Sequence, residues 1–268
     1  MVHPAALKAK DVSVVRFKLL NGYAIVVKGS IGPLKGLNFV LDTGAIPSVI
    51  NQRIAKKLGI QGRIDHVLLF SQTLEARSVV VRDIHIGPLA TPSAEVLSED
   101  LSSLEDRLGM RVDAIIGLDV LRTKRLRIDY ESRKLAFDQP VPLEHSCPIQ
   151  IRPGFVYVTI SVQDQKVSLV VDTGAKDLIL FASRIKGRFG ELRESGVKTV
   201  HNMGGELTLR GILLHKVRVG EESLREMQAF VLNNTGQADP GFDGLLGVRA
   251  LGTSEIAFDF EENRISWR

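Results

Sequence analysis

One segment of this chain occurs twice, and this repeat constrains the fold more than any other feature of the sequence. Asp42–Gly44 and Asp172–Gly174 both read Asp-Thr-Gly, and each follows an apolar run and precedes an alanine. The downstream segment Asp113–Gly117 is also repeated, in similar form, as Asp243–Gly247. The offset is constant, because 172 minus 42 and 243 minus 113 both give 130 residues. The sequence therefore contains one unit that has been duplicated.

The repeated unit is long enough to be a small domain with its own core. The chain has 268 residues, of which 44% are hydrophobic, and this is sufficient for two domains. We expect an N-terminal lobe at 1–139, a linker at 140–148 and a C-terminal lobe at 149–268. The expected linker contains three prolines and shows little hydrophobic periodicity.

Both halves are predicted to consist mainly of strands. The expected strands are short, rich in β-branched residues and separated by Gly or Pro. They are 23–27, 39–41, 78–86 and 126–130 in the first half, and 156–162, 169–171, 207–219 and 256–260 in the second. Helices are expected at 51–58, which ends before Gly59, and at 97–108, where leucines recur at spacings of four, three and four. The predicted fold class is all-β with a few short helices.

An Asp-x-Gly sequence after a strand is by itself typical of an ordinary turn, because Asp accepts hydrogen bonds from nearby N–H groups and Gly tolerates a positive φ. The duplication of the surrounding sequence argues against that interpretation. Two apolar-apolar-Gly segments, Ile115–Gly117 and Leu245–Gly247, follow the two turns at the same offset. Closing segments at 127–137 and 257–267 repeat in the same way. The two turns are therefore candidate functional sites.

These residues resemble the aspartic peptidases, and in particular the retroviral-type (retropepsin-like) branch with its bacterial relatives. In that family each catalytic aspartate lies in an apolar-apolar-Asp-Thr-Gly-Ala sequence, and a later apolar-apolar-Gly segment passes beside the turn. The resemblance covers nearly the whole chain. It implies an acid-protease fold with two homologous β-barrel-like lobes, which form a covalent pseudo-dimer of the retroviral-type unit.

The resemblance implies that Asp42 and Asp172 are jointly the catalytic residues of an aspartic endopeptidase. A peptide carbonyl is a poor electrophile, so water must lose a proton as it attacks while the carbonyl oxygen gains one. Two adjacent carboxyl groups do not both ionise readily, so one keeps its proton and the pair supplies both a base and an acid. The titration belongs to the pair. No covalent intermediate is implied.

The same resemblance implies roles for the residues that follow each aspartate. Thr43 and Thr173 are expected to point away from the cleft and to hydrogen-bond across the interface between the lobes. Gly44 and Gly174 are expected to offer their N–H groups to the carboxylates and to permit close approach of the backbone.

Ala45 and Ala175 occupy positions where pepsin-like enzymes commonly have Ser or Thr. A hydroxyl there donates to a catalytic carboxylate and favours its charged form, so alanine should leave the pair less acidic than in pepsins. We therefore expect activity in a mildly acidic to near-neutral range.

Retroviral-type units cover the cleft with a glycine-tipped hairpin, and the second half of this chain offers one at 201–206. Met203, Gly204 and Gly205 form its expected tip. The aligned stretch 70–73 in the first half contains no glycine, which departs from the symmetric two-flap pattern. The Gly204–Gly205 hairpin is a candidate mobile lid, and an ordinary tight turn is the alternative.

Other functional motifs are absent from the sequence. The six histidines are scattered, with no His-Glu-x-x-His pattern and no Cys/His cluster, so no metal or other cofactor is expected. Cys147 is the only cysteine, which excludes an intrachain disulfide. The net charge of +4 is spread along the chain and is weak evidence for nucleic-acid binding.

The expected partner is a peptide or protein substrate, and nucleic acid is not expected. The sequence has no apolar stretch long enough to span a membrane, and residues 1–8 lack the apolar core of a signal peptide. The chain is expected to be soluble as given. Its compartment stays open, and a periplasmic or secreted location applies if a leader was removed. A monomer is expected, because both halves of the site are present in one chain.

Two other classes of function stay open. The first is a non-catalytic module that binds peptides or regulates a partner, whose signature would be the loss of one aspartate. The second is a structural β-sandwich in which the two turns have no function. Both aspartates are retained although the halves have diverged at most other positions, and this favours the peptidase.

Overall fold

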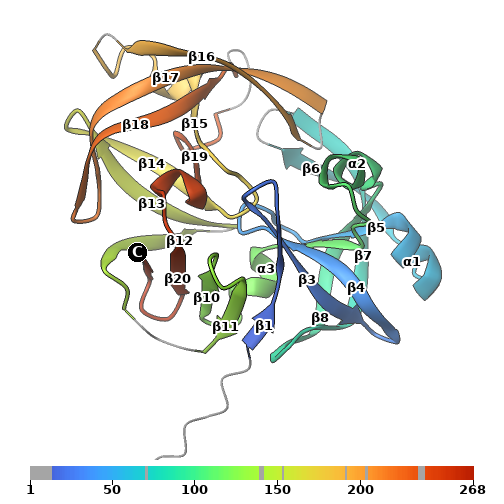
Figure 1. The fold of residues 1–268 in the computed structure, drawn as a ribbon. Helices are drawn as coiled ribbons and strands as arrows, with labels where there is room; N and C mark the ends of the chain where they lie inside the picture. The colour runs from blue at the N-terminus through green and yellow to red at the C-terminus, as the bar shows by residue number, and fades with distance from the viewer. Residues whose placement is uncertain are drawn as a thin grey trace, which may run out of the picture.

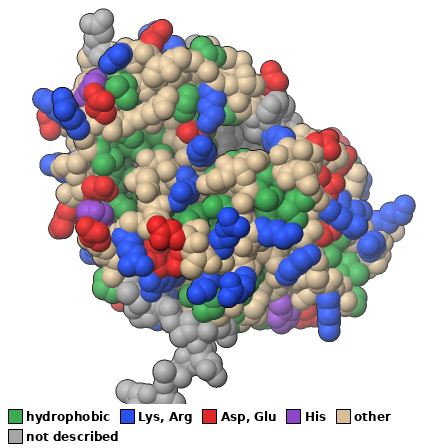
Figure 2. All heavy atoms as spheres, viewed as in Figure 1, with side chains coloured by type: hydrophobic (Ala, Val, Ile, Leu, Met, Phe, Trp, Pro, Cys, Tyr) green, Lys and Arg blue, Asp and Glu red, His purple; other side chains and the backbone are tan. Residues whose placement is uncertain are grey.

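The computed structural model describes residues 14–69, 72–138, 142–152, 154–190, 192–202, 205–234 and 239–268. Strands dominate these residues and form two lobes that correspond to the two halves of the sequence (Figure 1). Lys and Arg side chains are spread over much of the face shown in Figure 2, with acidic side chains among them. The fold class predicted from the sequence is confirmed.

The first lobe is an eight-stranded sheet with the order β2-β3-β4-β9-β5-β8-β7-β6. The strands in this order are β2 (Lys18–Leu20), β3 (Ala24–Ile31), β4 (Leu34–Leu41), β9 (Ala114–Ile116), β5 (Val49–Asn51), β8 (Leu89–Glu99), β7 (Gln72–Ile86) and β6 (Arg63–Leu69). The helices of this lobe are α1 (Gln52–Leu58), α2 (Ser102–Leu108) and α3 (Leu118–Leu121). Antiparallel hairpins make up most of the sheet, while β4 runs parallel to β9.

The second lobe repeats this topology strand by strand within a 13-stranded sheet. Its strands, in the corresponding order, are β12 (His145–Arg152), β13 (Phe155–Val162), β14 (Gln165–Asp172), β19 (Gly244–Gly247), β15 (Leu178–Phe181), β18 (Glu222–Leu232), β17 (Gly205–Val219) and β16 (Arg193–Asn202). Strand β14 runs parallel to β19, as β4 does to β9. The helical segments here are α4 (Ala182–Ile185) and the 3-10 helix η1 (Val248–Leu251). The duplication in the sequence is therefore a duplication of the fold.

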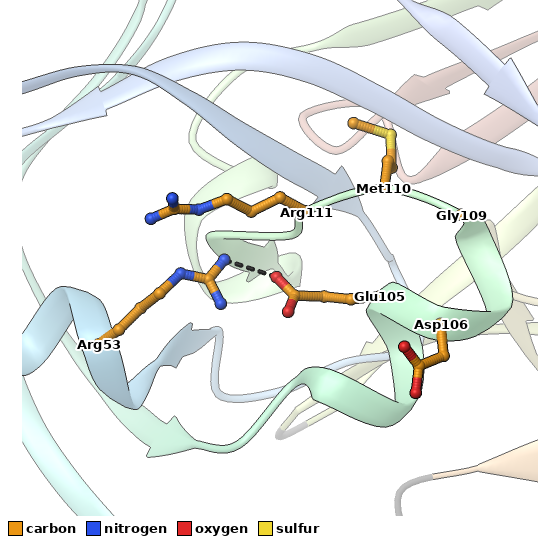
Figure 3. A pocket seen from close by; sticks show the side chains of 6 residues that line it. All are labelled: Arg53, Glu105, Asp106, Gly109, Met110 and Arg111. Carbon is orange, nitrogen blue, oxygen red and sulfur yellow. Dashed lines mark hydrogen bonds and ion pairs between the residues drawn. The ribbon is translucent and has the colours of Figure 1, made fainter.

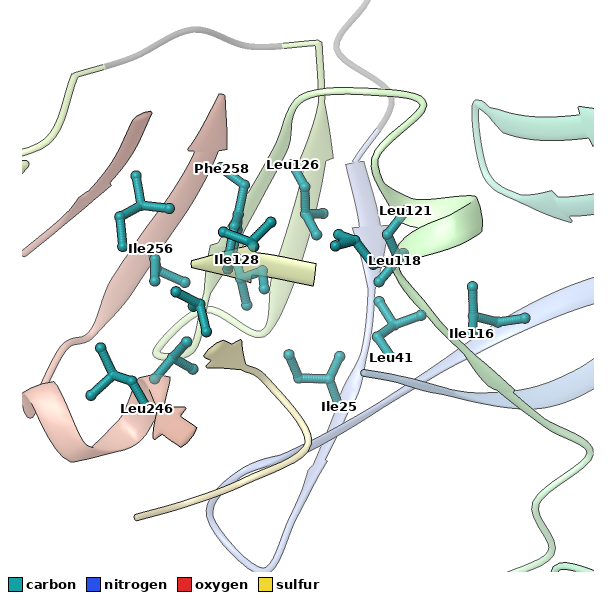
Figure 4. Close-up of a cluster of buried hydrophobic side chains, with 14 of the residues drawn as sticks. Ile25, Leu41, Ile116, Leu118, Leu121, Leu126, Ile128, Leu246, Ile256 and Phe258 are labelled. Atoms are coloured by element: carbon teal, nitrogen blue, oxygen red, sulfur yellow. The ribbon is translucent and has the colours of Figure 1, made fainter. Parts of the chain in front are cut away.

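The terminal hairpins of the two lobes join them through one continuous sheet. Strands β1 (Val14–Arg16), β11 (Lys134–Phe137), β10 (Leu126–Asp129), β20 (Glu255–Asp259) and β21 (Arg264–Trp267) lead in this order to β12. Strand β10 of the first lobe pairs antiparallel with β20 of the second, and Ile128 lies opposite Ile256. Figure 4 shows the apolar side chains beneath this junction, where both isoleucines are fully buried. Each such side chain contributes about 1.5–3 kcal/mol of burial free energy, so the two lobes share one core.

Helix α1 begins and ends where the sequence predicts. The side chain of Asn51 accepts a hydrogen bond from the N–H of Arg53 (3.1 Å), which caps the first turn. Gly59 ends the helix in the left-handed conformation, with φ of 65°.

The predicted helix at 97–108 is only partly correct. Leu97 belongs to strand β8, where it pairs with Val49, and α2 starts at Ser102. Leu97, Leu101 and Leu108 nevertheless bury into one cluster. The leucines have helical spacing although two kinds of element carry them. Strand β8 contributes Leu97 and helix α2 contributes Leu108, and both side chains pack in the same apolar cluster.

The linker expected at 140–148 needs a correction in its second part. Residues 139–141 lie outside the described residues, but His145 to Pro148 form the start of β12. Cys147 pairs with Ile265 of β21 and is 2% exposed. These residues belong to the sheet that joins the lobes, because their alternating side chains reach its core.

A buried carboxylate holds the corresponding strand in each lobe. Asp113 accepts hydrogen bonds from the N–H of Asn38 (2.9 Å), Arg53 Nη2 (3.2 Å) and Arg111 Nε (3.1 Å). Figure 3 shows Arg53 and Arg111 beside a surface hollow, with Arg53 also bound to Glu105 (2.6 Å).

The second lobe has the equivalent arrangement. Asp243 accepts hydrogen bonds from the N–H of Ser168 (2.9 Å) and from Arg184 Nε (3.1 Å), and Arg188 lies 2.9 Å away. The side chains of Asp113 and Asp243 are each 5% exposed. The repeated Asp at these positions is therefore a structural residue.

Replacing Asp113 by asparagine should lower the free energy of unfolding by about 1–3 kcal/mol, because the N–H of Asn38 and the guanidinium of Arg53 lose hydrogen bonds to a buried carboxylate. Asp243→Asn should cause a loss of similar size. Urea unfolding of both variants measures this, with Asp164→Asn at an exposed turn as the control. A loss no larger than that of the control in either variant would contradict a structural role for that carboxylate.

Candidate active site

The two Asp-Thr-Gly turns meet at the junction of the lobes. Asp42 directly follows β4, and its N–H donates to the carbonyl of Ile116 in the neighbouring parallel strand (3.0 Å). Asp172 is the last residue of β14 and lies opposite Gly247 of β19. Each aspartate thus emerges where a buried strand ends, held by the apolar-apolar-Gly segment of its own lobe.

Each glycine of these turns lies against the carboxyl group of the opposite lobe. A Cβ atom added to Gly44 would be 2.5 Å from Cγ of Asp172, and one added to Gly174 would be 2.5 Å from Cγ of Asp42. Within each turn the glycine N–H donates to its own aspartate, at 2.8 Å for Gly44 and 2.7 Å for Gly174. The positions admit no side chain, because this close approach is what brings the two carboxyl groups together.

Two threonines lock the turns to each other. The N–H of Thr43 donates to Oγ1 of Thr173 (2.9 Å), and the N–H of Thr173 donates to Oγ1 of Thr43 (3.0 Å). Each hydroxyl in turn donates to the opposite lobe, Thr43 to the carbonyl of Val171 (2.8 Å) and Thr173 to that of Leu41 (3.3 Å). Both threonines are at most 1% exposed. The carboxyl groups are therefore positioned by a closed network of four hydrogen bonds that crosses between the lobes.

The environment favours the protonated form of the pair. Removal from solvent raises the pKa of Asp42, while hydrogen bonds from Asp172 and from backbone N–H groups act in the opposite direction. Burial raises the pKa of Asp172 well above its ordinary value, and the adjacent charge of Asp42 raises it further. Because like charges in contact disfavour double ionisation, the pair retains one proton into a pH range where isolated carboxyl groups have lost theirs.

These raised pKa values imply a pH-dependent cost to stability. Protonation of the pair stabilises the folded state fully below the unfolded-state pKa, and this stabilisation is lost as the pH rises through the folded-state pKa. In Asp172→Asn the side chain at this position cannot ionise, so the variant should avoid much of this loss of stability at higher pH. The melting temperature of the variant relative to the native protein should therefore rise between acidic and neutral pH, as measured by circular dichroism. A difference that stays constant or falls would contradict the raised pKa.

The support beneath the two turns is not symmetric. In the first lobe Asp119 accepts hydrogen bonds from the N–H of Ser48 (3.0 Å) and from its hydroxyl (2.7 Å), and Ser48 Oγ accepts from the N–H of Gly117 (2.8 Å). This network ties the Asp42 turn to the apolar-apolar-Gly segment. Ser48 and Asp119 carry no sign of this pairing in the sequence, since they lie 71 residues apart and only the fold brings them together.

The second lobe replaces both residues of that network. Leu178 stands at the position of Ser48, and Arg249 at that of Asp119. The N–H of Gly247 donates instead to the carbonyl of Asp177 (3.0 Å), while the Arg249 guanidinium lies 4.6 Å from the centre of the Tyr130 ring. Arg249 therefore contributes to the contact between the lobes.

Apolar residues at corresponding positions flank the pair. Side chains two residues apart on a strand share one face, so Val40 lies on the face of Asp42, and Val170 on that of Asp172. Val40 packs in a cluster with Val49 and Ile115 in the first lobe. The corresponding cluster in the second lobe includes Val170 and Leu245. Each lobe thus has a buried apolar cluster next to its Asp-Thr-Gly turn.

Both lobes contain a hairpin where a flap is expected. In the second lobe β16 and β17 pair as far as Asn202 and Gly205, and Met203 and Gly204 lie outside the described residues. In the first lobe β6 and β7 pair as far as Leu69 and Gln72. The lack of glycine at 70–73 therefore does not prevent a first-lobe hairpin. The role of either hairpin as a lid stays a prediction.

Other kinds of site find little support in the part of the chain that the structure describes. Within it, no group of three His, Cys, Asp or Glu side chains is arranged to hold a metal ion. None of the described helices is long and apolar enough to cross a membrane. Burial raises the pKa of the Cys147 thiol to about 12, which keeps it in the unreactive protonated form.

Comparison with known proteins agrees with this geometry. The family model described as aspartyl protease matches residues 25–120 and again residues 158–250. The first match contains Asp42 and the second contains Asp172, so each lobe corresponds to one copy of the family unit. No curated protein sequence matches the chain. With two fused retropepsin-like repeats that together cover most of its length, this chain belongs to the aspartyl protease family.

Proposed function

We propose that the protein is an aspartic endopeptidase that hydrolyses peptide bonds of extended polypeptides. The observation that carries the proposal is the contact between Asp42 and Asp172, two carboxyl groups from different lobes held together by the Thr43–Thr173 network. Such an arrangement costs stability unless one proton is shared. A fold that maintains it has a paired acid and base available for chemistry.

The proposed reaction uses one water molecule and no covalent intermediate. The ionised carboxylate of the pair takes a proton from the water as its oxygen bonds to the peptide carbonyl carbon, and the protonated carboxyl gives its proton to the carbonyl oxygen. The tetrahedral intermediate then collapses and the C–N bond breaks. The amide nitrogen leaves with a proton from the protonated carboxyl group, while the ionised carboxylate takes a proton from one hydroxyl of the intermediate, so the pair regains its single proton. The N–H groups of Gly44 and Gly174 keep the inner carboxyl oxygens in place throughout.

Cleavage of a mixed peptide library by the purified chain tests this proposal directly. We expect cuts within the peptides rather than trimming at their ends, and inhibition by pepstatin, whose hydroxyl can take the place of the attacking water. Peptides that bind without being cleaved at any pH would contradict the peptidase and would identify a peptide-binding module.

Introducing a hydroxyl beside the pair should shift the pH dependence of activity. The native chain has Ala45 and Ala175 at these positions, and we expect its activity in the mildly acidic to near-neutral range. In Ala45→Ser or Ala175→Ser a hydroxyl that donates to the ionised carboxylate lowers the pKa, so the acidic limb of kcat/KM should move down by about one pH unit. Ala→Gly variants at the same positions are the control. A native optimum as acidic as that of gastric pepsins, or a shift to higher pH in the serine variants, would contradict the proposal.

A further inference from the structure

Helix α2 packs on the apolar cluster that also supports the Asp42 turn. Its residues Leu104 and Leu108 pack in the cluster that contains Val40, which lies on the face of Asp42. Tyr23 and Ala45 pack against the same cluster, and Ala45 is part of the Asp42 turn itself. Helix α2, Tyr23 and the Asp42 turn therefore pack on one apolar cluster.

Tyr23 lies close to several charged groups. It is half-buried in the turn before β3, which Figure 1 shows next to the loop between β14 and β15. Burial raises the pKa of Tyr23, Arg107 lowers it, and the carboxylates of Asp172, Asp42 and Asp177 raise it. The Tyr23 side chain is therefore within electrostatic range of both Arg107 and the catalytic pair.

Arg107 carries a buried donor without an acceptor. Its Nη1 atom is shielded from solvent and has no hydrogen-bond partner within the described part of the chain. Its backbone carbonyl accepts a hydrogen bond from Asn21 Nδ2 (3.2 Å), which ties α2 to the turn that carries Tyr23. An unpaired charged donor is costly in such a position, and a carboxylate is the acceptor that best compensates it.

The equivalent place in the other half is different. Ile25 pairs with Leu41 in the first lobe and Tyr157 with Val170 in the second, and continuing both registers to the turns aligns Tyr23 with Gly154. A Cβ atom on Gly154 would contact the side chain of Ile46 (3.4 Å). One side of the pair therefore has a phenol and a guanidinium where the other has a glycine against an aliphatic side chain.

One acidic group near Tyr23 already has a partner. Asp177 forms an ion pair with Lys198, which compensates its charge.

A basic residue near Gly154, Arg152, already has partners. Arg152 hydrogen-bonds to Gln150 Oε1, and its guanidinium lies 5.1 Å from the centre of the Tyr157 ring. It is thus a suitable control residue, since it is basic, close to the pseudo-symmetric position and already paired.

We propose that Arg107 and Tyr23 form a subsite that takes an acidic side chain of the extended substrate, on one side of the scissile bond only. The inference rests on the proposed peptidase function and specifies its substrate class. Arg107 supplies the charge, and the Tyr23 hydroxyl donates a second hydrogen bond to the same carboxylate.

The test compares peptides that carry Glu or Gln at each position around the cleaved bond. For the native chain we expect kcat/KM to favour Glu about tenfold at one position, the effect of one charge-assisted hydrogen bond. Arg107→Gln should reduce that preference to near one, chiefly through a lower kcat/KM for the Glu peptide. Tyr23→Phe should reduce it partially, and Arg152→Gln should leave it intact. Fluorescence anisotropy with the same peptides measures binding independently of cleavage.

The outcomes separate the subsite from the chemistry. Cleavage that requires Asp42 and Asp172 but shows no Glu preference, or a preference that Arg107→Gln retains, would overturn the subsite and leave the peptidase standing. Loss of the preference in Arg152→Gln instead would assign the acidic side chain to the other side of the pair. If the native chain cleaves nothing, the peptidase fails, and the anisotropy ratio of Glu to Gln peptides for native and Arg107→Gln chains still supports or overturns the subsite.

Discussion

Asparagine in place of either Asp42 or Asp172 is expected to reduce kcat/KM for peptide cleavage by at least about 10³-fold. The amide is close in size to the carboxyl group but cannot accept the proton of the attacking water or return a proton to the leaving nitrogen. Each single variant should lose nearly the full activity, because one carboxyl group alone cannot act as base and acid. The double variant should be little worse than either single one.

Two controls separate lost chemistry from lost structure. Asp164→Asn makes the same chemical change at an exposed turn and should leave kcat/KM unchanged. The circular dichroism and the oligomeric state of the dyad variants should match those of the native chain. Substantial activity in Asp42→Asn with loss only in Asp172→Asn would show that the two carboxyl groups do not act as a pair.

Removing one hydroxyl of the threonine network is expected to destabilise the protein and to impair activity together. In Thr43→Val the N–H of Thr173 and the carbonyl of Val171 lose their partners in a site that excludes water. Each orphaned polar group costs about 1–3 kcal/mol, so the free energy of unfolding should fall by roughly 2–4 kcal/mol. Thr173→Val should behave alike, since the network is nearly two-fold symmetric.

Serine is the matched control at these positions, because it keeps the hydroxyl and loses only a methyl group. Thr43→Ser should retain most of the stability and most of kcat. Denaturant unfolding and kcat/KM on one peptide measure both effects in the same set of variants. A valine variant that is as stable and active as the serine variant would show that the network does not hold the carboxyl groups in place.

Much of the site could be predicted from the sequence because the duplication carries the information. Two aspartates followed by Thr-Gly-Ala at a constant offset predict two similar turns, and the fold places both at one junction. Strands such as β13 and β17 were also predictable from their β-branched residues and their length. Helix α1 has both a cap and a terminal glycine in the sequence.

Features that depend on tertiary contacts were not predictable in the same way. The spacing from Leu97 to Leu108 looks helical, although a strand contributes its first leucine. Cys147 lies in a proline-containing stretch that predicts a linker, although in the structure it belongs to β12 and lies opposite Ile265 of β21. The difference between Tyr23 and Gly154 emerges only from strand register, because the turns that carry them differ in length and composition.

The central claim is that one chain supplies both carboxyl groups of one site. Equimolar mixing of Asp42→Asn and Asp172→Asn chains, assayed beside the native chain on the same peptide, tests it most directly. We predict that the native chain cleaves the peptide and that the mixture stays as inactive as each variant, because every variant chain holds an incomplete pair. Activity restored in the mixture would show that lobes of different chains assemble the site, and an inactive native chain would contradict the peptidase itself.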